Sequence, residues 1–349
     1  MPSNLSNSNQ QLFFSFDNYW PFYLGFTLFV LLLLALDLGV FHRKAHKVEI
    51  KEAISWSFVW IAIALTFNYI LYQYVFSKVA FSPELQALWG SPETVATTLS
   101  LEFLTGYIIE KALSVDNIFV FIVLFNYFSI KEEYQHRILF FGILGALLFR
   151  ALFIALGSFV MRFHFVSVAL GALLIYTGVK LFFSSDKPID PSKNRILKLL
   201  HKYLPVSAHF DGQKFFTIEN GRRVATPILV ALIFVELTDI VFAFDSVPAI
   251  FAITREPFIV FTSNVFAILG LRALYFLLAA VMHLFHFLKY ALGFILVFVG
   301  LKLSFLNWLF GGHFPQGWSL AIIASALMIA VILSLIIKKT GSTLDNSVS

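Results

Sequence analysis

Two short acidic segments dominate the interpretation of this chain: EKALSVDN at residues 110–117 and DIVFAFDS at residues 239–246. Each lies inside an apolar run long enough to cross a lipid bilayer, which takes about 20 residues as a helix. An ionised side chain in the hydrocarbon costs several kcal/mol, with about 2.5–3.5 kcal/mol as the low estimate, so it usually faces the protein interior and serves a function. We therefore expect both segments to lie in transmembrane helices and their carboxylates to converge on one polar cavity.

The composition supports an integral membrane protein. Hydrophobic residues make up 59% of the 349 positions and charged residues only 13%, whereas soluble domains carry roughly 25% charged residues. There is no cysteine, which excludes disulfides, thiolate metal sites, iron–sulfur clusters and cysteine nucleophiles. The net charge of +5 is spread over loops and forms no nucleic-acid patch. The expected partner of the surface is therefore the lipid bilayer, and no nucleic-acid partner is expected.

Hydropathy predicts an all-α, polytopic membrane protein of about nine transmembrane helices. The first 19 residues form a polar tail without Lys or Arg, unlike a secretory signal. The apolar runs are 20–41, 53–76, 99–126, 138–160, 164–184, 227–252, 257–283, 287–309 and 318–337.

The distribution of basic residues predicts the orientation. If the N-terminus is outside, most Lys and Arg residues fall in cytoplasmic segments, and only Lys78, Arg162 and Arg255 fall in outer ones. By the positive-inside rule, this places the N-terminus outside and the C-terminus in the cytoplasm. The expected location is the inner (plasma) membrane of a bacterium.

The chain contains an internal duplication. GALLIYTGVKL at residues 171–181 matches GFILVFVGLKL at residues 293–303, an offset of 122 that also aligns Arg150 with Arg272. The two acidic segments align at an offset of 129. Three crossings separate corresponding helices, so we predict an inverted repeat, a common plan of transporters with an ion site between the copies.

This duplication gives a domain plan. Residues 20–97 form two leading helices, 98–185 the first repeat, 186–226 a cytoplasmic loop, 227–310 the second repeat, and 311–349 the last helix with a C-terminal tail. Within the loop, residues 193–204 predict an amphipathic helix on the inner leaflet. Asn220-Gly221 predicts a hairpin turn between residues 215–218 and 223–226.

The intramembrane charges predict a cation site. The acids are Glu110, Asp116, Glu236, Asp239 and Asp245, and the basic groups are Lys111, Arg150 and Arg272. The formal excess of two negative charges suits one divalent cation, or two protons when it is absent. Carboxylate, amide and hydroxyl oxygens, including those of Asn117 and Ser246, favour Mn, Mg or Ca over Cu or Zn.

Two further residues are interpreted from their surroundings. Pro248 cannot donate a backbone hydrogen bond, so we expect a kink or unwinding beside Asp245. Asp37, near the inner end of the first helix, either lines the cytoplasmic mouth or pairs with Arg43.

These motifs resemble the TerC family, in particular its Alx-like members. The matching stretches are LDLGVFHRKAH at 36–46, EAISWSFVWIAIALTFN at 52–68, EKALSVDNIFVF at 110–121 and FVELTDIVFAFDSVPAIFAIT at 234–254. The resemblance implies an exporter-like protein, linked in the Alx-like members to manganese export and alkaline response; the family name comes from tellurium resistance. Carried over residue by residue, it implies a site made of Glu110, Asp116, Asn117, Glu236, Asp239, Asp245 and Ser246.

The leading hypothesis is thus a transporter that exports a divalent metal ion, with Mn²⁺ as first choice and protons as the candidate coupling ion. The alternative is a membrane scaffold in an envelope-stress or tellurium-resistance complex, in which the charges are structural. No enzymatic activity and no prosthetic group are expected, because an intramembrane aspartyl protease would need a Gly-x-Gly-Asp segment that this chain lacks. The sequence determines neither the coupling ion nor the oligomeric state.

Overall fold

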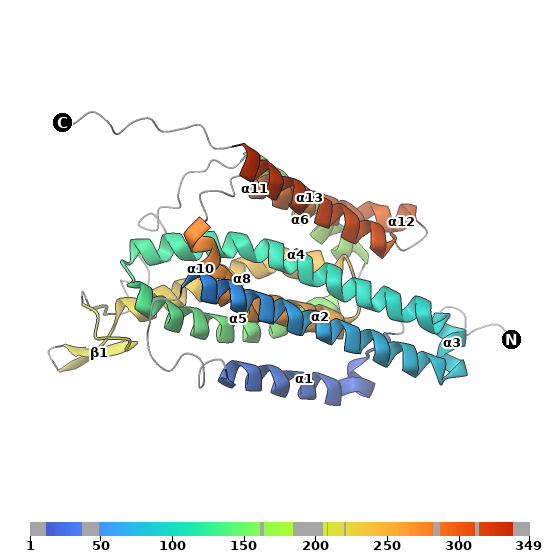
Figure 1. Ribbon diagram of the computed structural model, residues 1–349, viewed down its shortest axis with the longest axis horizontal. Coiled ribbons are helices and arrows are strands. Elements are labelled where there is room, and N and C mark those ends of the chain that lie inside the picture. Colours follow the sequence, from blue (N-terminus) through green and yellow to red (C-terminus); the bar gives the residue numbers. More distant parts are fainter. Residues whose placement is uncertain are drawn as a thin grey trace.

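The computed structural model describes residues 12–36, 49–160, 164–183, 205–207, 209–219, 221–281, 287–310 and 314–337. Over these residues the chain is helical apart from one small hairpin (Figure 1). The helices are α1 (Phe16–Leu36), α2 (Ile50–Ala80), α3 (Pro83–Trp89), α4 (Pro92–Tyr127), α5 (Glu132–Val160), α6 (His164–Phe183), α8 (Pro227–Phe251), α9 (Pro257–Leu269), α10 (Leu271–Val281), α11 (Leu288–Leu301), α12 (Asn307–Leu309) and α13 (Gln316–Ile336).

Each of the nine predicted segments coincides with one or two of these helices over its described residues. Six described helical segments are long and apolar enough to cross a membrane, and one of them, Lys289–Leu309, runs continuously from α11 through α12. A seventh span results if the bent pair α9–α10 counts as one. Helices α4 and α6 are not counted among these spans. Helix α4 carries the charged residues of the acidic segment, and the apolar part of α6 is shorter. The all-helical, polytopic membrane class predicted from the sequence is confirmed.

Proline sets the start of several helices. Pro83, Pro92, Pro227 and Pro257 each lie in the first turn of their helix, where the missing N–H would have had no intrahelical acceptor. The Ser91 side chain also accepts from the Thr94 N–H at 3.3 Å, which satisfies one free donor at the start of α4. Local sequence therefore fixes where these helices begin.

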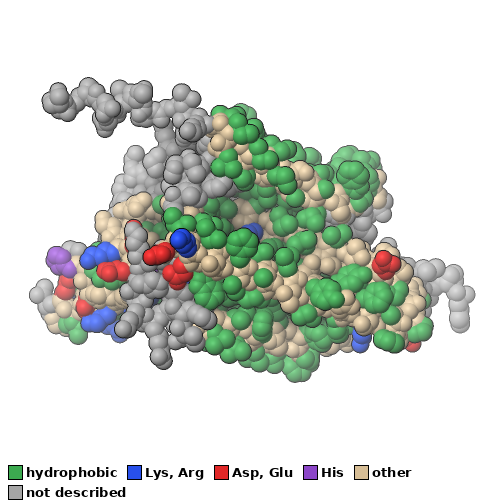
Figure 2. Space-filling view, in the orientation of Figure 1, with side chains coloured by type: hydrophobic (Ala, Val, Ile, Leu, Met, Phe, Trp, Pro, Cys, Tyr) green, Lys and Arg blue, Asp and Glu red, His purple; other side chains and the backbone are tan. Residues whose placement is uncertain are grey.

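The helices form a bundle with further helices packed on two of its sides. Helices α2, α4, α5 and α8 run along the centre, α1 lies along one side, and α6, α11 and α13 form a layer on the other (Figure 1). Apolar side chains cover the flanks, while charged ones gather near the ends, mostly at the end that carries the hairpin (Figure 2). On α1, residues such as Leu28 and Leu32 are exposed. This is the surface expected of a protein whose flanks contact lipid.

Close backbone contact joins α6 to α11. A Cβ at Gly171 would lie 2.8 Å from the carbonyl oxygen of Gly300, and one at Gly178 would lie 2.6 Å from that of Gly293. The four glycines, which lack side chains, therefore allow the two helices to approach this closely. The helices cross in opposite directions, and exchanging the two copies at the offset of 122 maps one glycine contact onto the other. Such an exchange is expected for copies related by a twofold axis.

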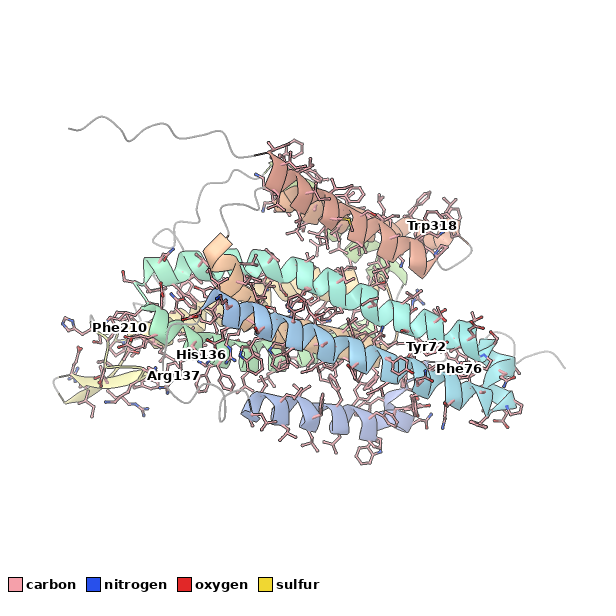
Figure 3. The ribbon with its side chains drawn as sticks, in the orientation of Figure 1. Tyr72, Phe76, His136, Arg137, Phe210 and Trp318 are labelled. Carbon is pink, nitrogen blue, oxygen red and sulfur yellow. The ribbon has the colours of Figure 1, made fainter. Side chains whose placement is uncertain are left out.

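The predicted hairpin is present. Strand β1 (Phe216–Glu219) pairs antiparallel with β2 (Arg222–Ala225), and Gly221 has a φ of +73° in the turn. The guanidinium of Arg137 on α5 lies 4.7 Å from the ring centre of Phe215, next to β1, and His136, Arg137 and Phe210 lie at this same end of the bundle (Figure 3). The hairpin therefore packs against the start of α5. The predicted amphipathic helix at 193–204 lies outside the described residues.

A short segment before α1 docks onto the start of α9. The backbone N–H groups of Phe13 and Phe14 donate to the Glu256 carboxylate at 2.7 and 3.0 Å. Phe14 is fully buried, and its ring lies 5.1 Å from that of Phe258. Burial raises the pKa of the Glu256 carboxyl to about 6, although the two N–H groups favour its ionised form.

The structure contains a helix break that the sequence did not predict. Unwinding at Pro248 is not seen, because α8 stays helical to Phe251 and the Ala252 N–H bonds to the Pro248 carbonyl at 3.0 Å. The missing N–H of Pro248 therefore removes one backbone hydrogen bond, the one to the Phe244 carbonyl, without ending the helix. The break lies instead at Gly270, where α9 and α10 meet at an angle of 43°.

Candidate functional site

The centre of the bundle holds a buried cluster of charges around Arg150. This side chain projects from α5 and is 2% exposed. One guanidinium nitrogen, Nη1, donates to Glu110 Oε1 on α4 and to Asn264 Oδ1 on α9, the latter at 2.6 Å. The other, Nη2, lies 3.6 Å from Asp239 Oδ1 on α8. A single arginine thus joins side chains from three other helices.

Asn264 is held in the orientation that this contact needs. Its Nδ2 group donates to the Val260 carbonyl at 2.9 Å, which turns the Oδ1 atom toward the guanidinium. Sequence reasoning missed this residue. The only available signal was an amide inside an apolar run, in the segment TSN at 262–264.

The two acidic segments contact each other in a reciprocal way. Asn117 Nδ2 of the first segment lies 3.4 Å from Asp239 Oδ1 of the second. Ser246 of the second segment faces the Glu110 carboxylate of the first, although its hydroxyl makes no hydrogen bond within the described structure. The offset of 129 exchanges these two contacts, as the glycine contacts are exchanged. Both observations support the proposed inverted repeat.

Several buried oxygen atoms of this cluster have no hydrogen-bond partner among the described atoms: Glu110 Oε2, Glu236 Oε2, Asp239 Oδ2 and Ser246 Oγ. Buried polar atoms in proteins nearly always have a partner, which can be protein, water or an ion. Three of these atoms belong to carboxylates, which are the ligands of hard divalent cations. The donor set therefore fits such an ion, although no group of three or more acidic or histidine side chains stands at metal-binding spacing in the part of the chain that is described.

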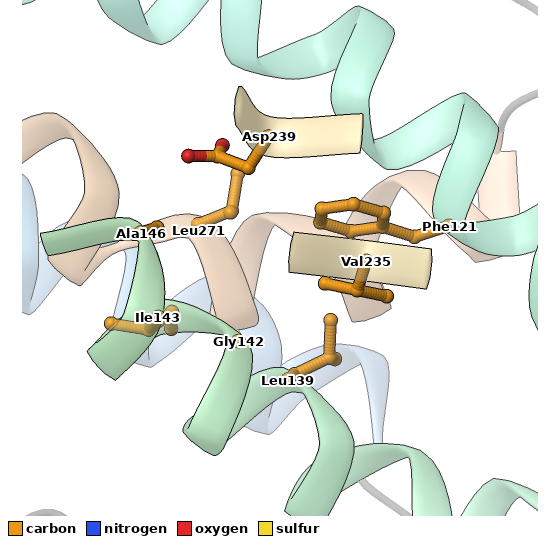
Figure 4. A pocket seen from close by; sticks show the side chains of 8 residues that line it. All are labelled: Phe121, Leu139, Gly142, Ile143, Ala146, Val235, Asp239 and Leu271. Carbon is orange, nitrogen blue, oxygen red and sulfur yellow. The ribbon is translucent and has the colours of Figure 1, made fainter. Parts of the chain in front are cut away.

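The Glu236 side chain reaches the cluster past Gly145 of α5, where no side chain stands in its way. It lies three residues before Asp239 on α8, and a Cβ placed on Gly145 of α5 would be 2.1 Å from its Oε1 atom. Next to it, a cavity of about 10 Å³ is lined by Asp239 and by apolar residues of α4, α5, α8 and α10 (Figure 4). A cavity of this size has room for about one water molecule at most. The cavity lies toward the predicted cytoplasmic side of Asp239, because Phe121, Leu139 and Val235 line it.

The remaining predicted site residues lie elsewhere or outside the described part. Arg272 contacts His136 Nε2 at 2.9 Å, near the end of the bundle that carries the hairpin. Asp116 and Asp245 lie on α4 and α8, but their side chains are not among the described ones, and Asp37 lies outside the described residues altogether. The structure thus brings together Glu110, Asn117, Glu236, Asp239, Ser246 and Arg150, while convergence of the other two acids stays a prediction.

The fold and this centre define a polytopic helical membrane protein with a charged cluster buried between its helices. The model of the integral membrane protein TerC family matches residues 95–342. The chain belongs to this TerC family. It is 47% identical over 322 residues to the "Uncharacterized membrane protein STKORF319" of Myxococcus xanthus, covering 92% of this chain and 94% of that one.

A second relative carries a functional name. The chain is 40% identical over 312 residues to the "Putative membrane-bound redox modulator Alx" of Escherichia coli strain K12, covering 89% of this chain and 92% of that protein. An "Uncharacterized membrane protein" of Rickettsia bellii is 38% identical over 307 residues, or 88% and 94% of the two chains. No solved structure matches this chain.

Proposed function

We propose that this protein exports a divalent cation, with Mn²⁺ as first choice, through the centre around Arg150. The observation that carries the proposal is the set of buried carboxylate oxygens of Glu110, Glu236 and Asp239 that lack a hydrogen-bond partner among the described atoms. These three carboxylates and the one guanidinium of Arg150, which contacts Glu110 and Asp239, give a formal excess of two negative charges. A divalent cation neutralises this excess.

The choice of ion follows from the ligands and from the family. Carboxylate, amide and hydroxyl oxygens bind Mn, Mg and Ca in preference to softer metals. Among these, Mn²⁺ is chosen because the resemblance to Alx-like members implies it. The Escherichia coli relative is named as a redox modulator, and this chain has no cysteine with which to perform thiol exchange. Movement of a redox-active metal ion offers one route to such an effect.

Arg150 has a specific part in this mechanism. In the described conformation its guanidinium contacts both Glu110 and Asp239 and offsets one of their two negative charges. An ion that binds these carboxylates takes over that role, and Asn264, already 2.6 Å from Nη1, remains as the partner of the arginine. When the ion leaves, the arginine returns to the acids. The formal charge of the centre is zero with the divalent ion bound, and two protons on the carboxylates keep it at zero after the ion leaves.

The described conformation is closed toward the predicted cytoplasm. A cavity of about 10 Å³ adjoins Asp239 on that side, and its lining is otherwise apolar (Figure 4). A narrow apolar constriction is impassable to a hydrated ion. Ion entry therefore requires α5 and α8 to separate at Val235 and Gly142, which both line the cavity. Protons compete with the ion for the same carboxylates and are the proposed coupling ion.

The test is ion flux into proteoliposomes across a panel of Mn²⁺, Mg²⁺ and Ca²⁺ at two pH values. Asp239→Asn keeps the shape and one carbonyl oxygen but removes a charge, so we expect Mn²⁺ flux to fall by about tenfold or more. The control is Glu102→Gln. Glu102 lies nearer the N-terminal end of α4 than Glu110 does, and its carboxylate accepts a hydrogen bond from Thr254. Flux of the wild-type protein should also weaken at low pH.

The same assay distinguishes ion export from the alternative, a structural scaffold. In the scaffold hypothesis the Arg150 ion pairs only hold helices together, and a specific observation favours it: both guanidinium Nη atoms already contact acids. Wild-type Mn²⁺ flux from Asp239→Asn protein, at equal reconstitution, would show that the acids are structural. The scaffold function would then lead.

A further inference from the structure

The span formed by α9 and α10 is broken in the middle. Helix α9 ends at Leu269, α10 starts at Leu271, and the two meet at 43°. A helix that ends inside a bilayer leaves its last carbonyl groups without intrahelical donors and carries a partial negative charge there. With little water nearby, those carbonyls need another donor from the protein.

Lys111 supplies that donor. Its Nζ atom donates to the Ala267 carbonyl at 3.0 Å. Within the described structure the ammonium group forms no salt bridge, so this carbonyl is its specific contact. Lys111 directly follows Glu110 on α4, and the two side chains point about 100° apart around the helix. One short stretch of α4 therefore carries both a carboxylate of the charged centre and the cation at the end of α9.

Gly270 makes room for this ammonium. A Cβ at Gly270 would lie only 2.5 Å from Lys111 Nζ and 3.2 Å from Trp60 Cβ on α2. A side chain at this position would displace the lysine from the carbonyl or push α2 away. The glycine, the lysine and the break thus fit one another, which is independent evidence that the contact belongs to the fold.

The break determines where two functional side chains point. Before it, α9 carries Asn264, which accepts from Arg150 at 2.6 Å. After it, α10 carries Arg272, which contacts His136 at 2.9 Å near the start of α5. A straight helix could not hold both contacts unchanged, because the second arm would swing away by the angle of the bend.

Only one of the two repeats contains this arrangement. The offset of 122 aligns Gly270 with Leu148, and α5 continues unbroken through that residue. The offset of 129 aligns Lys111 with Ile240, which cannot donate from its side chain. The lysine and the break are therefore paired in sequence as well as in space, and they make the two halves of the centre different.

We infer that Lys111 is a positioning residue whose ammonium holds the α9–α10 bend and thereby keeps Asn264 against Arg150. The ammonium occupies the place at the C-terminal end of a half-helix where other transporters coordinate a cation. Its effect on ion movement rests on the proposed function, whereas its effect on the bend does not.

The bend can be measured directly, because the chain has no native cysteine and accepts specific spin labels. Labels at Ala279→Cys on α10 and Glu133→Cys on α5 use two exposed positions. If α10 straightened onto the axis of α9, its nine residues from Leu271 to Ala279 would carry the label through roughly 10 Å, at about 1.5 Å per residue. Lys111→Met should shift the distance between the labels by several ångströms, and Lys111→Arg should leave it near the wild-type value. The control is Lys180→Met, an exposed lysine at the end of α6.

Flux provides the second measurement. Lys111→Met should lower Mn²⁺ flux by about tenfold or more, as displacement of a binding group by about 1 Å can do, and Lys111→Arg should restore most of it. Gly270→Ala should shift the label distance in the same direction without removing a charge. Gly25→Ala, which meets nothing within 4 Å, should be silent. If Lys111→Met fails to fold, these two glycine variants still test the positioning role, because neither changes a charge.

The outcomes separate the two proposals. An unchanged label distance in both Lys111→Met and Gly270→Ala overturns the positioning role, whatever the flux. A shifted distance that Lys111→Arg corrects, together with lost and restored flux, supports it. If wild-type protein moves no divalent ion at all, the proposed function fails, and the label distances still decide whether Lys111 holds the bend.

Discussion

Replacing Arg150 by Met gives the sharpest test of the charged centre. The side chain is 2% exposed, and its partner Glu110 is fully buried. Methionine has similar length and no charge, so the change leaves Glu110 and Asp239 without their counter-charge and Asn264 without its donor. Removal of one partner from a buried ion pair usually costs about 3–5 kcal/mol.

This magnitude is readily measured. About 3–5 kcal/mol corresponds to a fall in Tm of at least roughly 6 °C, at about 2 °C per kcal/mol for a chain of this size. The assay is thermal unfolding of purified protein in detergent, followed by tryptophan fluorescence. Adding Glu110→Gln to Arg150→Met removes one of the two uncompensated carboxylates and should recover part of the loss, with a coupling of about 0.5–3 kcal/mol.

Manganese links this stability test to the proposed function. An ion that binds the folded protein at 100 times its Kd adds about 2.7 kcal/mol. Because Arg150→Met leaves the carboxylates free for the ion, Mn²⁺ should raise the Tm of this variant more than that of the wild type. Arg137→Met, on the same helix but stacked on Phe215, is the control and should gain nothing extra. A loss of stability that Mn²⁺ does not reverse would refute an ion-binding centre and favour purely structural charges.

Two further predictions follow from particular contacts. Gly145→Ala places a Cβ 2.1 Å from Glu236 Oε1 and must displace this carboxylate without altering any charge; Mn²⁺ flux should fall, whereas Gly317→Ala, in open space, should keep it. Burial raises the pKa of Glu256 to about 6 from 4.5, so its protonated form is favoured by folding. Stability from this group is present below pH 4.5 and lost as pH rises through 6, by about 2 kcal/mol. Unfolding of Glu256→Gln protein measured from pH 4 to 7 should lack this slope, and an unchanged slope would refute the assignment.

The sequence by itself determined the class of the protein and the position of its helices. A bilayer imposes a local requirement, about 20 apolar residues in a row, and each run of that kind forms helix over most of its described residues. The hairpin around Gly221 was equally predictable, because a turn with positive φ depends on few residues. The cost of burying charge also singled out Glu110, Asp239 and Arg150, which do meet.

Only the tertiary structure decided which groups surround those charges. Asn264 entered the centre because α9 packs against α5, and Glu236 could approach because Gly145 lacks a side chain. The break at Gly270 has the same kind of origin. Proline removes one backbone hydrogen bond within its own helix, whereas the bend at Gly270 is held by Lys111, 156 residues away on another helix. Contacts between distant helices depend on how the whole bundle packs, and no local pattern encodes them.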